Sequence, residues 1–186
     1  MYEEIALLEI AIWFGLPAWI ANSTPVIFGG GTPIDRSMVF RDGHRLLGDG
    51  KTIRGFVIGV LLGTLTSLVQ SAVAPYIFPV LMEYVVVTTE MQALLFINPI
   101  TGFLLSLGAL MGDLVGSFVK RRIDVRSGNP APVLDQIGFI IMALIFVSPI
   151  IQPAAVYVII LVAVTLGVHW FSNAIGFLLG LKDNPW

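Results

Sequence analysis

The residues best suited to chemistry gather where an apolar stretch ends, between positions 112 and 135. The chain reads Gly-Asp-Leu-Val-Gly-Ser-Phe-Val-Lys-Arg-Arg over 112–122, and a further aspartate follows at 135. A carboxylate at the edge of hydrocarbon is costly, so we expect it to hold a cation. The cluster of cations that follows suits phosphate groups. The pattern therefore predicts a metal-dependent enzyme that acts on phosphoryl groups at a membrane surface.

Two carboxylates in this stretch are candidate ligands of Mg²⁺. Asp113 and Lys120 lie seven residues apart, two helical turns, and Ser117 falls between them on the same helix face. A turn-rich connector then returns the chain to Asp135 at the start of the next helix. Carboxylates from two neighbouring helices suit a Mg²⁺ site shared with substrate phosphates. The residues alone leave open that Asp113 pairs with Lys120 or Arg121, and that Asp135 is a helix N-terminal charge.

The first long polar segment, about 29–53, is a second candidate for phosphate contact. It ends in Gly-Lys-Thr at 50–52, but a P-loop would need a glycine where Arg45 stands and a strand before it. Lys51, Thr52 and Arg54 still offer backbone N–H groups and positive charge at the start of a helix. The residues also allow a different interpretation, a basic loop that rests on anionic lipid.

The composition is that of an integral membrane protein. Hydrophobic residues make up 56% of 186 positions and charged residues 12%, and the mean hydropathy is +0.91. The absence of cysteine excludes disulfides, thiol nucleophiles and zinc–thiolate sites. We predict a single all-α membrane domain over 1–186, a polytopic helix bundle with five transmembrane helices. These helices are expected at roughly 5–26, 55–75, 93–118, 134–149 and 154–180.

The distribution of positive charge predicts the topology. All ten Lys and Arg lie in the first connection, the third connection or the C-terminal tail. The positive-inside rule then places the N-terminus outside, the C-terminus in the cytoplasm, and the loops at about 29–53 and 120–132 in the cytoplasm. Glu3 and Glu4 stand where a secretory signal would carry positive charge, so we expect the first helix to be retained.

Glycines at four-residue spacing predict close packing of two of these helices. The two sets are Gly55, Gly59 and Gly63, and Gly108, Gly112 and Gly116. Ridges of small residues let helix backbones approach closely. Asp113 follows Gly112 directly, so we expect it to face the interior of the bundle.

The same residues carry a family resemblance. The string from Gly112 to Arg121, followed by Asn-Pro-Ala-Pro-Val-Leu-Asp at 129–135, resembles the signature of the membrane CTP:phosphatidate cytidylyltransferases. It departs from the bacterial pattern, because Asn-Pro-Ala-Pro replaces Pro-Gly-His-Gly-Gly and Asp135-Gln136 replaces Asp-Arg. These departures, the small size and the segment from Asn22 to Gly55 resemble the archaeal branch, the CDP-archaeol synthases, over nearly the whole chain.

The resemblance implies a substrate pair and a division of roles. Asp113 and Asp135 would hold Mg²⁺, and the substrates would be CTP and an isoprenoid ether-lipid phosphate, di-O-geranylgeranylglyceryl phosphate. The lipid phosphate would attack the α-phosphorus of CTP and expel pyrophosphate. Lys120 and Arg121 would then stabilise the reacting phosphates.

The nucleotide contacts are predicted more loosely. Lys51 and Arg54 are candidates for the triphosphate of CTP, and Asn129 or Asn22 for the cytosine edge, with helix capping or turn formation as the alternative. We expect a multi-pass protein of the cell membrane with no nucleic-acid partner, and the sequence leaves its oligomeric state open, a homodimer included. A CTP-dependent lipid kinase and a small membrane transporter are the competing functions.

Overall fold

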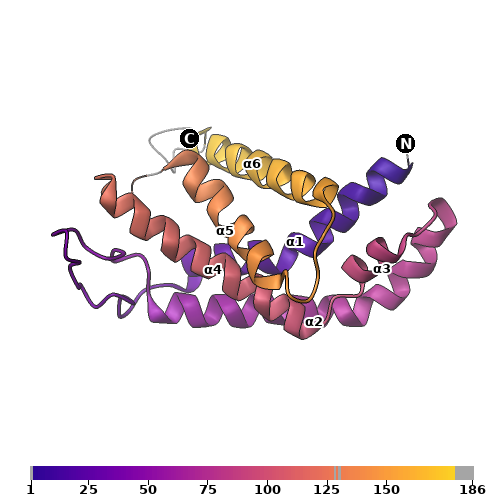
Figure 1. Cartoon of the computed structure of the whole chain (residues 1–186), viewed down its shortest axis with the longest axis horizontal. Coiled ribbons are helices and arrows are strands. Elements are labelled where there is room, and N and C mark those ends of the chain that lie inside the picture. The colour runs from indigo at the N-terminus through magenta and orange to yellow at the C-terminus, as the bar shows by residue number, and fades with distance from the viewer. Residues whose placement is uncertain (1, 128, 130, 179–186) are drawn as a thin grey trace.

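The computed structural model describes residues 2–127, 129 and 131–178 of the chain. Within that part the protein is all-α, with two isolated β-bridges and no strand (Figure 1). The all-α prediction is confirmed, and five of the six helices match the five predicted spans. The helices are α1 Tyr2–Phe28, α2 Ile53–Tyr84, α3 Thr89–Leu95, α4 Pro99–Arg122, α5 Pro132–Val147 and α6 Ala155–Leu178.

Three of the helices, α1, α2 and α4, are long and apolar enough to cross a membrane by length and composition. The apolar parts of α5 and α6 that the structure describes are shorter, at Val133–Val147 and Ala155–Phe171. The expectation of a short fourth helix agrees with α5, which has 16 residues. The number of membrane crossings and the orientation of the termini stay predictions.

Helix α4 packs on α1, α2 and α5, while α6 lies on α1 and α5. The predicted glycine ridges are at these contacts. A Cβ added at Gly59 would lie 2.8 Å from the carbonyl oxygen of Ala21 on α1. One added at Gly112 would lie 2.7 Å from the carbonyl oxygen of Gly138 on α5. Only glycine lets these backbones approach so closely.

The predicted start of the third span was wrong. The span was expected from residue 93, whereas residues 93–95 end the short helix α3 and α4 begins at Pro99. The physical reason is a cap: the side chain of Asn98 accepts a hydrogen bond from the backbone N–H of Thr101. Proline at the first helical position has no N–H to leave unsatisfied, so Asn98-Pro99 is a strong helix start.

A proline in α1 frees a backbone group that α2 then satisfies. Pro17 cannot donate to the carbonyl of Trp13, four residues before it. The side-chain amide of Gln70 on α2 donates to that carbonyl at 2.6 Å instead. A backbone oxygen unpaired in hydrocarbon would cost several kcal/mol, so this contact joins α1 to α2.

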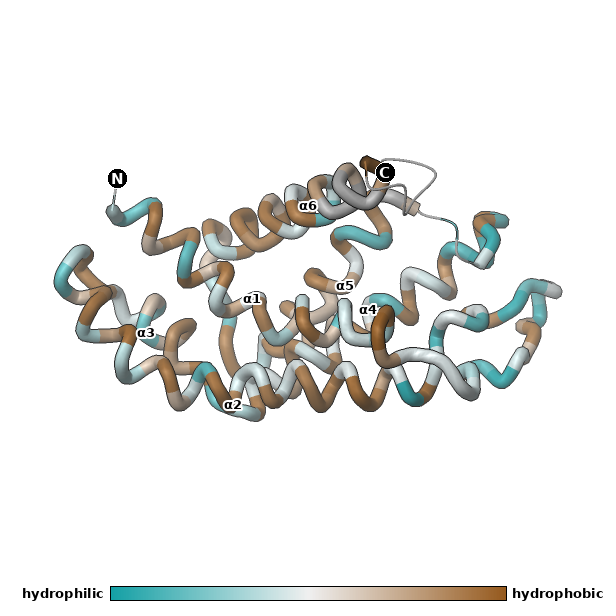
Figure 2. Tube along the Cα trace, turned by 180° about the vertical axis from the view of Figure 1, so that it is seen from behind, coloured by the Kyte–Doolittle hydropathy of each residue, from teal (hydrophilic) through white to brown (hydrophobic). Residues whose placement is uncertain are grey.

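The first loop and the C-terminal end of α4 lie together at one end of the molecule, and the N-terminus lies at the opposite end (Figure 1). Hydrophilic residues are concentrated along this loop and the end of α4 beside it (Figure 2). The two segments predicted to face the cytoplasm are therefore on the same side of the bundle.

Candidate functional site

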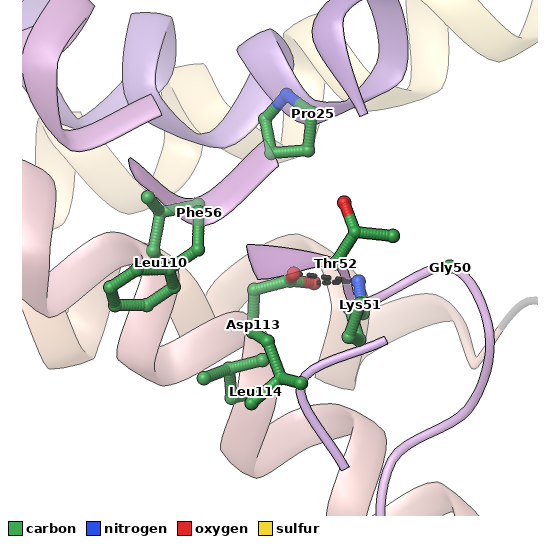
Figure 3. Close-up of a pocket in the computed structure, with 9 residues that line it drawn as sticks. Pro25, Gly50, Lys51, Thr52, Phe56, Leu110, Asp113 and Leu114 are labelled. Carbon is green, nitrogen blue, oxygen red and sulfur yellow. Dashed lines mark hydrogen bonds and ion pairs between the residues drawn. The ribbon is translucent and has the colours of Figure 1, made fainter. Parts of the chain in front are cut away.

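Two lysine–carboxylate ion pairs form the centre of the candidate site. The ammonium of Lys51, from the end of the first loop, contacts both carboxylate oxygens of Asp113 at 2.6 and 2.7 Å (Figure 3). The ammonium of Lys120 contacts the Oδ1 of Asp135 at 2.7 Å. Asp113 and Lys120 come from one face of α4, so the two pairs lie along the same side of that helix. Four of the predicted site residues thus form two separate ion pairs on one side of α4, which we call the polar strip.

Packing between α4 and α5 determines where Asp135 lies along the axis of α4. Gly112 lies against Gly138, and Gly116 lies against Leu134, so the two helices run antiparallel in this register. Asp135 follows Leu134 directly. It therefore lies within about one helical turn of Asp113 along the axis of α4.

The alternatives that the sequence left open have a mixed outcome. Asp113 takes its cation from Lys51, 62 residues away, and not from Lys120 on its own helix. Asp135 does also act at a helix N-terminus, because its Oδ2 accepts a hydrogen bond from the backbone N–H of Ala131 at 2.8 Å. Its other oxygen remains with Lys120, so the capping role and the ion pair coexist.

A small, half-open pocket lies beside the Lys51–Asp113 pair. Both charged groups line it, together with the backbone at Gly50 and the side chain of Thr52. Thr52 is buried and caps α2, since its hydroxyl accepts from the backbone N–H of Gly55. The rest of the lining is mostly apolar: Pro25, Ile34, Phe56, Leu110 and Leu114.

Arg121 and Ser117 are buried on α4, at 9% and 3% exposure. The Nε of Arg121 is buried without a hydrogen-bond partner among the described residues. Burying a guanidinium nitrogen without a partner is costly, and the described part of the protein does not satisfy all the donors of Arg121. Arg121 therefore differs from its neighbour Lys120, whose ammonium is already paired.

Three other predicted site residues that the structure describes make no hydrogen bond or ion pair with the residues of the two ion pairs. The side chains of Arg54 and Asn129 are exposed, and that of Asn22 is half-buried in α1. The backbone N–H of Asn129 donates to the carbonyl of Arg126, which agrees with turn formation. In the part of the chain that the structure describes, none of the three side chains makes a hydrogen bond.

The sequence did not single out Asp35, which organises the whole first loop. Its carboxylate is buried at 2% exposure and accepts from the guanidinium of Arg45 at 3.1 and 3.2 Å. It also accepts from the backbone N–H groups of Ser37, Leu47 and Gly48. Burial alone would raise the pKa of Asp35, but the hydrogen bonds from Arg45 and these amides outweigh it and hold the pKa well below its usual range.

Known proteins with the same organisation identify the family. The family model of the CarS-like CDP-archaeol synthases matches residues 4–186. The CDP-archaeol synthase of Thermococcus kodakarensis is 46% identical over 176 residues, 95% of each chain. That of Pyrococcus horikoshii is 45% identical over 180 residues, 97% of each chain. That of Methanocaldococcus jannaschii is 43% identical over 182 residues, 97% of this chain and 98% of the relative.

A solved structure gives the same result at the level of the fold. It is that of an intramembrane enzyme for archaeal membrane lipid biosynthesis, 37% identical, with a TM-score of 0.70. The match covers 88% of this chain and 92% of that one. The chain is therefore a multi-pass membrane protein and belongs to the CDP-archaeol synthase family.

Proposed function

We propose that the strip formed by Lys51, Asp113, Lys120 and Asp135 is where this chain transfers CMP from CTP to an unsaturated archaeal ether-lipid phosphate. The products are the CDP-lipid and pyrophosphate. The observation that carries the proposal is the pairing of two carboxylates with two lysines on one side of α4. Triphosphate brings the negative charge that these lysines can bind, and a metal ion brings the positive charge that the carboxylates need.

The residues present fit a Mg²⁺ ion that is shared with the substrate. In the described residues no three acidic or histidine side chains converge on one point, so these residues alone would not enclose the ion. Mg²⁺ is usually held by one or two carboxylates together with substrate phosphates. Asp113 and Asp135 would supply those carboxylates, and the ion, when bound, would neutralise charge on the phosphate oxygens.

The cations of the site have separate roles in this proposal. Lys51 binds the triphosphate of CTP as it leaves Asp113, and Lys120 and Arg121 stabilise the phosphates that react. An oxygen of the lipid phosphate forms a bond to the α-phosphorus of CTP, and the bond between the α-phosphorus and the bridging oxygen breaks. The electron pair leaves with pyrophosphate. The protein contributes position and charge rather than a covalent intermediate.

Five further contacts belong to the proposal at the nucleotide end. Thr52 and Ser117 offer hydroxyls beside the ion pairs, and Arg54 adds positive charge at the start of α2. Asn129 or Asn22 would complement the cytosine edge through its side-chain amide. Their exposed or half-buried positions leave all three of Arg54, Asn129 and Asn22 free to meet a ligand.

The proposal includes a topology. One membrane domain over 1–186 with five crossings would place the N-terminus outside and the C-terminus in the cytoplasm. Its support is that the first loop and the end of α4, the two most basic segments, lie together at one end of the bundle (Figure 2). CTP would then reach the site from the cytoplasm. A homodimer stays a prediction.

The activity can be tested with purified protein, Mg²⁺, the ether-lipid phosphate and CTP labelled in either its α- or its γ-phosphate. Cytidylyl transfer moves the α-label to lipid and releases the γ-label as pyrophosphate. Transfer of the γ-label to lipid would instead show the CTP-dependent kinase. The absence of labelled lipid in both arms would contradict the proposal.

Asp113→Asn and Asp135→Asn test the metal ligands. Each should lower turnover by about a hundredfold or more, because an amide cannot supply the charge that the site needs. Asp124→Asn is the matched control, since that side chain is 84% exposed and should keep full activity. Near-native turnover in either site variant would show that the metal site is placed wrongly, and thermal unfolding checks that each variant folds.

A further inference from the structure

Arg122 closes the basic run at the end of α4, but its guanidinium binds protein groups on several sides. Its Nε contacts the carboxylate of Asp42 at 3.1 Å. Its Nη1 donates to the carbonyl oxygens of Leu46 at 3.3 Å and Arg45 at 3.4 Å. Asp42, Arg45 and Leu46 all belong to the first loop. One side chain of α4 therefore holds that loop at both its backbone and an acidic side chain.

The flat face of the same guanidinium is also occupied. Its carbon lies 3.4 Å from the centre of the Phe118 ring and 4.9 Å from that of Phe40. The two rings pack edge to face, with their centres 5.7 Å apart, and Phe40, like Asp42, belongs to the first loop. Stacking of this kind needs the planar guanidinium of arginine, which lysine does not have.

The loop segment that Arg122 contacts leads along the chain to Lys51 in the polar strip. Leu46 precedes Leu47 and Gly48, whose N–H groups bind Asp35. The carbonyl of Gly48 accepts from the backbone N–H of Lys51 at 3.2 Å. The side chain of Lys51 then reaches Asp113, as Figure 3 shows.

We propose that Arg122 is a positioning residue that fastens the first loop to α4 and so places Lys51 beside Asp113. This role differs from that of Lys120 and Arg121, to which the proposed function gives the reacting phosphates. The inference rests on the proposed function, because it assigns Arg122 an effect on CTP binding through Lys51. It predicts that Arg122 and Asp42, which carry opposite charges, affect CTP binding in the same direction.

The sign of the Asp42 effect separates this role from direct phosphate binding. If Arg122 bound phosphate itself, Asp42→Asn would remove a competing carboxylate and lower the KM for CTP. If Arg122 holds the loop, Asp42→Asn removes one of its contacts and raises the KM. The two models therefore predict changes of opposite sign from one substitution.

The experiment measures KM for CTP and kcat for the variants in the full chain. Arg122→Gln should raise the KM about tenfold, the loss expected for one charge-assisted hydrogen bond, and leave kcat within about threefold. Arg122→Lys should raise it as well, because lysine keeps the charge but loses the fork and the stacking. The double variant Arg122→Gln/Asp42→Asn should have the same KM for CTP as Arg122→Gln alone, because both substitutions remove the same contact. Arg41→Gln, an exposed position in the same loop, is the charge-matched control.

Limited trypsin digestion gives a readout independent of activity. Cleavage within the first loop should be faster in Arg122→Gln and Asp42→Asn, which both keep every Lys and Arg of that loop, than in the wild type. A lower KM in Asp42→Asn, or unchanged KM and cleavage in Arg122→Gln, would overturn the inference. If the wild type makes no CDP-lipid, the proposed function fails, while the digestion still decides whether Arg122 holds the loop.

Discussion

Replacing Asp35 by asparagine should loosen the first loop by about 3 kcal/mol. The carboxylate accepts on both oxygens: Oδ2 from Leu47, Gly48 and Arg45, and Oδ1 from Ser37 and Arg45. Asparagine keeps one acceptor and turns the other into a donor that faces two donors. Two hydrogen bonds to a charged group are lost, each about 1.5–3 kcal/mol. Water offsets part of this loss, because the side chain of Arg45 is 26% exposed.

The assay is hydrogen exchange of a peptide that covers residues 46–50, followed by mass spectrometry. A loss of about 3 kcal/mol should speed exchange of the Leu47 and Gly48 amides roughly a hundredfold. Asp49→Asn is the control, since Asp49 pairs with the same guanidinium at 2.6 Å but is 75% exposed. An exposed pair is worth about 1 kcal/mol at most, so exchange should change by about fivefold or less. An equally small effect of Asp35→Asn would refute the assignment of Asp35 as the organiser of the loop.

Two other predictions follow from the same structure. Gly112→Ala should lower stability by about 1–3 kcal/mol in thermal unfolding, because its Cβ would lie 2.7 Å from the carbonyl oxygen of Gly138. Gly116→Ala is the control, since its Cβ would meet Leu134 at an ordinary 3.8 Å, and an equal loss there would contradict the packing argument. The pKa of Asp35 is lower in the folded protein than in the unfolded chain, so ionised Asp35 stabilises the fold. This stabilisation is complete above the unfolded pKa of about 3.9 and is lost as the pH falls through the folded pKa. Pepsin, which is active in acid, should therefore leave the first loop intact at pH about 4 and cleave it only at lower pH; cleavage of the loop already at pH about 4 would contradict this prediction.

The sequence was sufficient for the parts of the fold that depend on local pattern. Long charge-free intervals located the five helices that match the predicted spans, apart from the start of α4, and glycine spacing located the contacts of α4 with its neighbours. Where the prediction of α4 failed, the signal was present but outweighed: Asn98-Pro99 is a helix start inside an apolar stretch. Averaged hydropathy does not detect such a helix boundary, because one polar residue scarcely changes the mean over about 20 positions.

The candidate site was harder, because its contacts join distant segments. The helical period placed Asp113 and Lys120 on one face, yet nothing local indicates that Lys51 reaches Asp113 from 62 residues away. Asp35 resembled any acidic residue of a polar loop. Its carboxylate accepts from the N–H of Ser37, two residues on, and its carbonyl from the N–H of Met38, so locally it is a turn-forming aspartate, a role common to many loop aspartates.

The bond from Gln70 to the carbonyl of Trp13 has a consequence for biogenesis. Synthesis runs from the N-terminus, so α1 enters the membrane before its partner in α2, which follows 57 residues later. Until then the carbonyl freed by Pro17 faces lipid or the insertion machinery without its native donor. As an isolated segment the first helix therefore has an unsatisfied backbone carbonyl, which gains its native donor only when the second helix packs on it.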